Sequence, residues 1–212
     1  MNEGGKAGLL WLGTEKCDLL FRVAGIGAKE GRRVLVIDNS LCGDFFSAVA
    51  GADPGLDDVN RGNLTALRDY KYEEAMLGAF DHVFYYQGMN RRARASGRFD
   101  ILVVQSTALG HEIRAARDEA AEAPRAPRTV LVYRDRASKK VSPPALAEEL
   151  SVEPDETITM DYDRGDMSQY VSLTLDGDFG RLRDAGEDMR EAVAWFAGEL
   201  YGMGAKDLKR YR

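Results

Sequence analysis

The chain has 212 residues, of which 44% are hydrophobic and 30% are charged, and these proportions suit one globular α/β domain over residues 1–212. The formal net charge of −6 argues against sequence-independent nucleic-acid binding, which depends on cationic side chains that neutralise phosphates. No apolar run approaches the ~20 residues that span a bilayer, and the N-terminus lacks a secretory signal, so we expect a cytoplasmic protein.

The first predicted element is a buried strand at Leu9–Leu12, which stops at a tight turn over Gly13–Lys16. A helical pattern of apolar residues begins directly after the turn. A strand, a turn that carries a lysine and a helix, in that order, are typical of a phosphate-binding loop, in which helix amides and a lysine hold polyphosphate. The candidate nucleotide-binding residues lie in this loop and at the end of the next strand: Gly13, Thr14, Lys16, Cys17, Asp18 and Asp38.

Gly13 and Lys16 fall on the second glycine and the invariant lysine of the motif K-G-G-x-G-K-T-T. Leu12–Cys17 therefore resembles the loop of the MinD/ParA family of P-loop NTPases, in the SIMIBI class. The resemblance implies a three-layer α/β fold, with a mostly parallel sheet flanked by helices, and ATP or ADP as the ligand. Five positions depart from the motif: Trp11 replaces the signature lysine, Leu12 the first glycine, Glu15 the third glycine, and Cys17 and Asp18 the two threonines.

Three of these replacements bear directly on phosphate and magnesium binding. If position 15 needs a positive φ, a residue other than glycine costs ~1 kcal/mol there. Glu15 and Asp18 are expected to stabilise the free helix N-terminus by ~0.3–1 kcal/mol each, so the protein supplies its own anions where those of a nucleotide would sit. The soft thiol of Cys17 is a poor ligand for the hard magnesium ion.

Arg33–Asp38 is predicted as a second buried strand, rich in β-branched residues. Its end resembles the family segment V-L-L-I-D-x-D-P-x-G, in which the first aspartate lies near the metal and the second positions the attacking water. Asp38 and Gly43 match this segment, but Ser40 stands where the second aspartate belongs. The sequence leaves two interpretations of Asp38 open, a site residue and a turn former or helix cap.

After Asp44 we expect a short helix, a loop with turn residues at Arg61–Asn63, and a helical segment near Tyr72–Leu77. Asp81–Tyr86 is predicted as a third strand, and a basic helix or loop follows it at Gln87–Ser96. The arginines of that segment are the best candidates for contacts with DNA, but the acidic net charge argues against such a partner.

Phe99–Gln105 is the clearest predicted strand, and it resembles the Walker B strand of the family, y-D-y-v-i-i-D-t-p. Asp100 matches the first acid of that motif. Gln105 occupies the position of the second acid, which in the family holds magnesium through water. Because glutamine lacks the charge for that role, we expect no metal site.

The remaining predicted elements alternate between helix and strand: helix Glu112–Ala121, strand Thr129–Arg134, helix Pro143–Leu150, strand Thr157–Tyr162 and helix Gly180–Tyr201. MinD relatives use a C-terminal amphipathic helix as a membrane anchor. The basic tail here, residues 205–212, has only Leu208 and Tyr211 as apolar anchors, so we expect it to be flexible and solvated, without membrane association.

Replacements in three separated motifs predict a catalytically degenerate MinD/ParA-like protein, with no catalytic residue and weak or no binding of ATP or ADP. We expect it to bind another protein as a scaffold, positioning or regulatory factor, and a homodimer stays open. The same residues leave two alternatives, a slow ATPase that uses Asp38 or Asp44 in place of the missing acids, and a nucleotide sensor that uses Lys16. An unrelated α/β domain with an accidental match is the remaining alternative.

Overall fold

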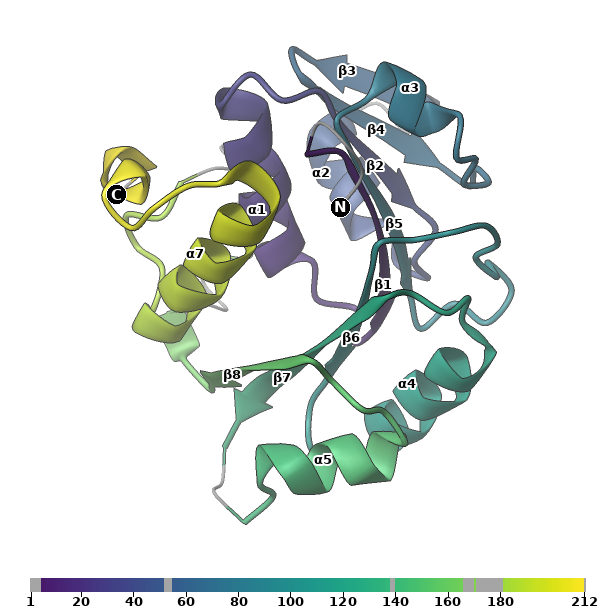
Figure 1. Ribbon diagram of the computed structural model, residues 1–212, viewed down its shortest axis with the longest axis vertical. Helices are drawn as coiled ribbons and strands as arrows, with labels where there is room; N and C mark the ends of the chain where they lie inside the picture. The colour runs from purple at the N-terminus through teal and green to yellow at the C-terminus, as the bar shows by residue number, and fades with distance from the viewer. Residues whose placement is uncertain (1–4, 52–54, 138–139, 166–169, 171–180, 212) are drawn as a thin grey trace.

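The computed structural model describes residues 5–51, 55–137, 140–165, 170 and 181–211, which are arranged around one sheet (Figure 1). The strands are β1 (Ala7–Gly13), β2 (Val34–Asp38), β3 (Asp58–Arg61), β4 (Leu64–Arg68), β5 (His82–Gly88), β6 (Ile101–Ser106), β7 (Arg128–Arg136) and β8 (Glu156–Asp161). The helices are α1 (Asp18–Lys29), α2 (Asp44–Ala50), α3 (Met76–Ala79), α4 (Gly110–Glu122), α5 (Pro143–Leu150), α7 (Glu187–Tyr201) and the 3-10 helix η1 (Asp207–Tyr211).

The eight-stranded sheet has the order β3-β4-β2-β5-β1-β6-β7-β8. All neighbouring strands are parallel except β3, which runs antiparallel to β4. β1 lies in the interior of the sheet, and all seven of its residues are buried because helices cover both faces. The structure confirms the predicted three-layer, mostly parallel α/β fold.

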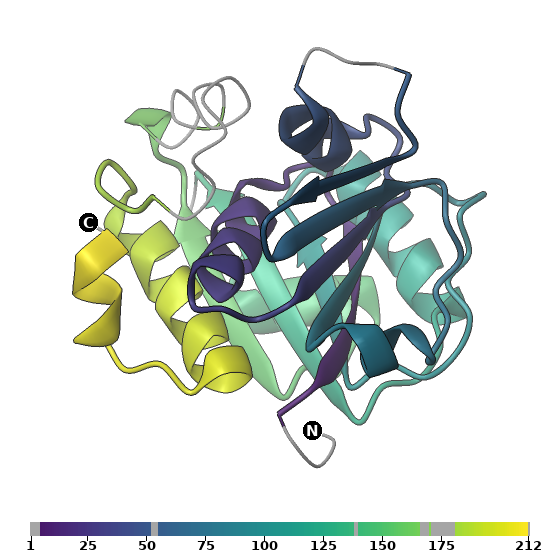
Figure 2. The same ribbon diagram turned by 90° about the horizontal axis from the view of Figure 1, so that it is seen from above.

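Helices cover both faces of the sheet (Figure 2), and a hydrophobic cluster lies on each face. On one face, Leu9 and Trp11 of β1 belong to a cluster that includes residues of α1, α2 and α7. On the other face, Leu10 and Leu12 belong to a cluster with residues of α4 and α5. This division follows from the two-residue period of a strand, which sends successive side chains to opposite faces.

The candidate loop lies where the chain changes direction. β1 leads into α1 on one face of the sheet, whereas the neighbouring β6 leads into α4 on the other face (Figures 1 and 2). Such a divergence leaves a crevice at the carboxyl ends of the two strands, where open α/β sheets bind their ligands. Residues 13–17 are therefore at the position that the fold favours for a site.

The segment between α2 and α3 is a β-hairpin, where we had predicted a loop. The predicted turn at Arg61–Asn63 joins its two strands, and Gly62 has the positive φ of 67° that such turns require. Leu64 and Ala66 of β4 are buried, but β3 is a mostly exposed edge strand with polar residues. An edge strand of this kind has no apolar pattern, so hydrophobic periodicity could not predict it.

The two predicted helices outside the central elements are shorter than expected. The helical segment predicted near Tyr72–Leu77 is reduced to the four residues of α3, because Tyr72 instead packs on Phe99 with ring centroids 4.3 Å apart. The helix predicted over Gly180–Tyr201 begins at Glu187 in the part of the chain that the structure describes.

The basic tail folds back onto the domain, which corrects the prediction of a flexible, solvated segment. Leu208 is buried, and the backbone amide of Leu182 donates a hydrogen bond of 2.6 Å to the carbonyl oxygen of Tyr211. Arg210 forms an ion pair with Glu30 at the end of α1. Two apolar side chains are sufficient to order η1 because a neighbouring surface receives them. Among the described helices, none is long and apolar enough to cross a bilayer.

Candidate functional site

Gly13 ends β1 at a point where only glycine fits. Its φ is +99°, a conformation that other residues rarely adopt, and a Cβ atom there would collide with the carbonyl oxygen of Gln105. The next residue, Thr14, donates its backbone N–H to the same oxygen at 2.9 Å. The match to the second glycine of the motif therefore reflects close contact between the loop and β6.

Gln105, which stands in the position of the Walker B acid, holds the loop by its side chain. The amide nitrogen Nε2 is buried and donates to the carbonyl oxygens of Thr14 at 2.9 Å and Lys16 at 2.8 Å. A carboxylate cannot donate these hydrogen bonds. Gln105 therefore makes two hydrogen bonds within the protein that an acid at this position could not make.

Several backbone amides of the loop are already used inside the chain. Thr14 N donates to Gln105, Lys16 N donates to the carbonyl oxygen of Thr14 at 2.8 Å, and Leu19 N donates to the Asp18 carboxylate at 3.0 Å. A phosphate-binding loop presents such amides to its ligand. Here they hold a compact turn together.

Both charged residues at the start of α1 pair with the end of β7. The Nζ atom of Lys16 forms an ion pair with Asp135, and the two oxygens of Asp18 each accept a 2.8 Å hydrogen bond from the Arg134 guanidinium. The Asp18–Arg134 pair is almost completely buried. Burial is the largest single influence and raises the pKa of Asp18, but the charge and hydrogen bonds of Arg134, the Leu19 N–H and the Arg22 charge together hold that pKa below its usual value. Asp18 is therefore ionised at neutral pH, and its charge is compensated by the protein itself.

Glu15 points away from these pairs, toward the loops that follow β2 and β5. Its carboxylate accepts backbone N–H groups from Met89 at 2.6 Å, Leu41 at 3.4 Å and Cys42 at 3.5 Å. Burial raises the pKa of Glu15, although these amides act in the opposite direction. Glu15 is not among the described residues with positive φ, so the backbone cost that we considered at this position does not arise.

Asp38 lies near the loop, but its oxygens are occupied by neighbouring parts of its own segment. One oxygen accepts from the backbone N–H and hydroxyl of Ser40 at 3.1 and 2.6 Å, and the other accepts from the backbone N–H of Phe46 at 2.9 Å. Phe46 is in the first turn of α2, so these contacts favour the helix-cap interpretation. Burial raises the pKa of Asp38.

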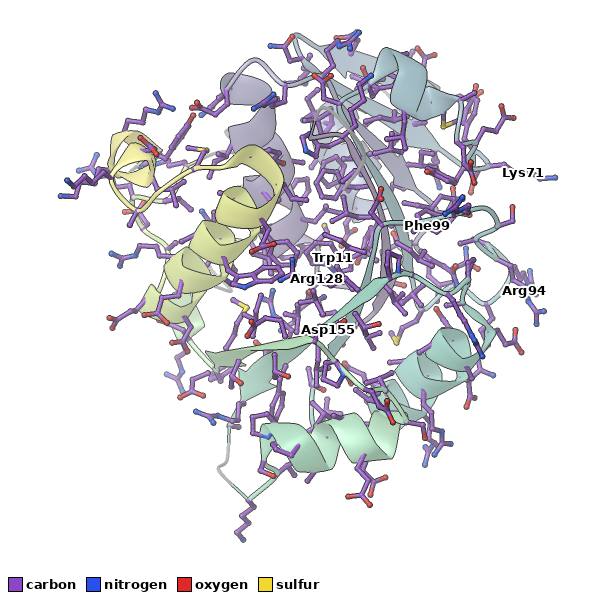
Figure 3. All side chains as sticks on the ribbon, viewed as in Figure 1. Trp11, Lys71, Arg94, Phe99, Arg128 and Asp155 are labelled. Atoms are coloured by element: carbon purple, nitrogen blue, oxygen red, sulfur yellow. The ribbon has the colours of Figure 1, made fainter. Side chains whose placement is uncertain are left out.

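Cys17 and Trp11 are core residues. The Cys17 side chain is fully buried, its Sγ lies 3.7 Å from the hydroxyl of Tyr170, and burial raises the pKa of the thiol well above its usual value. A neutral, buried thiol is a poor metal ligand. Trp11 lies between the sheet and α7 and stacks on Phe196, with ring centroids 5.2 Å apart (Figure 3). Because this side chain is buried in the core, it cannot reach a second molecule.

A cavity of about 210 Å³ adjoins the loop. Its lining includes two cationic and four acidic side chains together with two tyrosines: Lys16, Arg134, Glu15, Asp18, Asp135, Asp163, Tyr162 and Tyr170. Ligand sites for drug-sized molecules usually enclose about 300–1,000 Å³. An excess of carboxylates and a small volume do not fit a magnesium–nucleotide complex. Within the described residues, no three His, Cys, Asp or Glu side chains are placed to hold a metal ion.

Sequence reasoning missed the residues that hold the loop from outside the motifs. Arg134 and Asp135 of β7 were not among the predicted site residues. Glu112 of α4 was not considered, although its carboxylate accepts the hydroxyls of Thr14 and Thr107, each at 2.7 Å. The available signal was the opposite-charge pair Arg134-Asp135 near the carboxyl end of a buried parallel strand, because that end shares an edge of the sheet with the loop.

Comparisons with known proteins identify the fold. Protein-family models and curated proteins give no match to the sequence. Solved structures match it over nearly its whole length. The MinD cell division ATPase of Pyrococcus furiosus is 12% identical with a TM-score of 0.60, over 93% of this chain and 99% of that one. In the MinC:MinD complex of Aquifex aeolicus the matched chain is 16% identical with a TM-score of 0.60, over 93% and 97%.

A ParA family ATPase from Chlorobium tepidum TLS is 11% identical with a TM-score of 0.55, and the match covers 90% of this chain and 97% of that one. Structural matches with sequence identities of 11–16% establish a similar fold and nothing more. They confirm the MinD/ParA-like fold that the loop and strand order had predicted.

Proposed function

We propose that this chain is a catalytically degenerate MinD/ParA-like protein that works through protein contacts, as a scaffold, positioning or regulatory factor in the cytoplasm. The observation that carries the proposal is the pairing of both charged groups of the loop with the end of β7. A lysine held by Asp135 is not free to neutralise phosphates, and the carboxylate of Asp18 stands at the helix start where an anion would bind.

Other replaced groups support the same proposal, because each has a structural role of its own. Gln105 anchors the loop, Trp11 fills the core and Cys17 is buried. Nucleotide hydrolysis in this fold depends on positioning and charge neutralisation, so it needs a free lysine, a magnesium hydroxyl and an acid together. Lys16 is paired with Asp135, the Thr14 hydroxyl donates to Glu112, and Asp38 accepts from its own segment, and these contacts support the proposal.

The carboxyl edge of the sheet offers a surface for a protein partner. Four large apolar side chains that are exposed each follow a strand running in the same direction: Leu41 after β2, Tyr70 after β4, Leu109 after β6 and Tyr162 after β8. Leu41 is 64% exposed and Leu109 is 54% exposed. Exposed apolar side chains along one edge of a sheet support a protein interface there. One structural match is a complex of MinD with MinC, and here the partner is another protein or a second copy.

Calorimetric titration with magnesium–ATP, combined with an assay of phosphate release, tests the proposal. We expect no heat of binding and no turnover, because the lysine and the helix start are already paired. Asp135→Asn is the informative variant, since it releases Lys16 and is expected to strengthen any residual binding. Turnover by the unmodified protein that Lys16→Ala abolishes would contradict the proposal.

A nucleotide sensor is the second candidate, and the partial exposure of Lys16 favours it; the cavity beside the loop would have to widen to admit a nucleotide. Lys16 lines this cavity, its side chain is 26% exposed, and Tyr162 lies in the same lining with an exposed ring. Binding of ATP or ADP without phosphate release, lost in Lys16→Ala, would support this function.

A further inference from the structure

Three backbone amides from two separate loops converge on the carboxylate of Glu15. Its Oε1 atom accepts from Met89 at 2.6 Å and from Leu41 at 3.4 Å, and its Oε2 atom accepts from Cys42 at 3.5 Å. Leu41 and Cys42 follow β2, whereas Met89 follows β5. These two strands are neighbours in the sheet, so their carboxyl ends bring the amides together. Converging amides of this kind form anion-binding concavities.

The amides are positioned by contacts that do not involve Glu15. The side chain of Asn90 donates to the carbonyl oxygen of Asn39 at 2.7 Å, and the backbone N–H of Asn39 donates to Tyr86 at 2.8 Å. These hydrogen bonds join the loop after β2 to the loop after β5. Gly88, with a φ of +58°, turns the chain so that the N–H of Met89 faces the carboxylate, and a Cβ at this glycine would collide with Glu15.

We propose that the amides of Leu41, Cys42 and Met89 form a carboxylate-binding site that Glu15 occupies from within, and that an external carboxylate binds there when Glu15 is withdrawn. Both oxygens of Glu15 are engaged, which matches the two-oxygen geometry of a carboxylate. Leu41 and Cys42 are exposed, so the site can be reached from solvent. One part of the inference rests on the proposed function: if the protein binds another protein, the external carboxylate is an acidic side chain of that partner.

The surroundings favour an anion with a single negative charge. Burial is the main cause that raises the pKa of Glu15 and that of the Cys42 thiol. Asp38 adds to the effect at Glu15, and Glu15 and then Asp44 add to it at Cys42, so carboxylates surround the site. A dianion such as phosphate meets more repulsion from these carboxylates than acetate does. Selectivity for acetate over phosphate is therefore part of the inference.

The test uses Glu15→Ala, which empties the site, with the exposed Glu73→Ala as the matched control that leaves it filled. Each protein is titrated with sodium acetate at constant ionic strength while backbone amide signals are recorded by NMR. In Glu15→Ala we expect saturable shifts at Leu41, Cys42 and Met89, with an affinity at least ~10-fold higher than in the unmodified protein and in Glu73→Ala. Inorganic phosphate is expected to bind more weakly than acetate.

A blocked dipeptide, acetyl-Leu-Glu-amide, separates the two sources of carboxylate. Tighter binding than acetate assigns the site to an acidic side chain beside an apolar residue, and equal binding assigns it to a small free carboxylate. If Glu15→Ala loses its native amide dispersion, Glu15→Ser gives the same test with a hydrogen-bonding group retained. Acetate shifts no larger than in the unmodified protein, or tighter binding of phosphate, would overturn the inference. The ATP titration is independent of this result, so the two proposals can fail separately.

Discussion

The two sides of the loop at Gly13–Asp18 are held in different ways. Toward β7, side chains pair with side chains, and Asp18 and Arg134 are both removed from solvent. Toward β2 and β5, a single side chain, that of Glu15, meets backbone amides. In the first arrangement, loss of either partner leaves a buried charge. In the second, the amides remain in place when the acid leaves, so the partner is replaceable. Variants on the two sides of the loop should therefore differ in stability, as follows.

Arg134→Met is expected to have the largest effect. It leaves the buried carboxylate of Asp18 without its bidentate partner, and removal of one member of such a pair costs ~3–5 kcal/mol in the free energy of unfolding. Urea denaturation monitored by circular dichroism measures this loss. The double variant Asp18→Asn with Arg134→Met removes both charges and is expected to recover most of the stability. A double variant no more stable than Arg134→Met would contradict the role of the buried charge.

Gln105→Glu is the next largest perturbation. It replaces the donor that holds Thr14 and Lys16 with an acceptor, so two carbonyl oxygens lose a partner and face a carboxylate, at a cost of ~2–3 kcal/mol. The control is Gln105→Met, which removes the same hydrogen bonds without adding charge and should lose less. Equal stability of the Glu and Met variants in urea would count against a buried charge at this site.

Glu119 of α4 is hydrogen-bonded to Gln87 at the end of β5, and it predicts a pH dependence. Burial raises the pKa of Glu119 to about 7, while its carboxylate accepts from the Gln87 side chain at 3.1 Å. Arg91 lowers this pKa, and Glu15 and Asp118 raise it. In the unfolded chain the pKa is near the ordinary glutamate value of about 4.3, so between that pH and 7 only the folded protein keeps the proton.

Stability should therefore fall as pH rises through this window, by ~1–2 kcal/mol after allowance for solvent screening. Glu119→Gln is expected to flatten the profile between pH 5 and pH 8 when thermal unfolding is followed at each pH. A profile with the same slope in the variant would show that another group is responsible.

The smallest expected effect is at the exposed pair between the loop after β5 and α4. Arg91 lies 2.6 Å from Asp118, but both side chains are well exposed, so Arg91→Ala should cost no more than ~0.5 kcal/mol and the loss should vanish in high salt. Arg92→Ala, which removes an arginine that has no ion pair within the described chain, is the control. If urea denaturation showed a loss above ~1 kcal/mol in the free energy of unfolding, this exposed pair would behave like the buried Asp18–Arg134 pair, contrary to the prediction.

The fold was predictable where strands are buried. β1, β2 and β6 are continuous apolar runs, and a run of that kind between turn residues is a direct consequence of a sheet covered on both faces. β3 escaped prediction because an exposed edge strand has no such requirement. The ordered tail was not predicted either, because the apolar residue Leu208 does not by itself indicate which surface of the domain it packs on.

The candidate site was predictable in its composition but not in its contacts. The replacements at Glu15, Cys17 and Gln105 can be read directly from the sequence. Their partners could not, because the contact of Asp18 with Arg134 depends on the strand order β1-β6-β7, which places residues 116 positions apart on one edge. The direction of Glu15 likewise depends on the adjacency of β2 and β5.

The side chain of Gln105 also determines what an engineered magnesium site in this loop would require. Both hydrogens of its amide are committed to carbonyl oxygens, so an aspartate at this position would set a negative charge against them. Cys17, Asp18 and Arg134 would also have to be changed before that aspartate could face a metal ion. A design that begins at position 105 alone therefore loses stability before it gains a ligand.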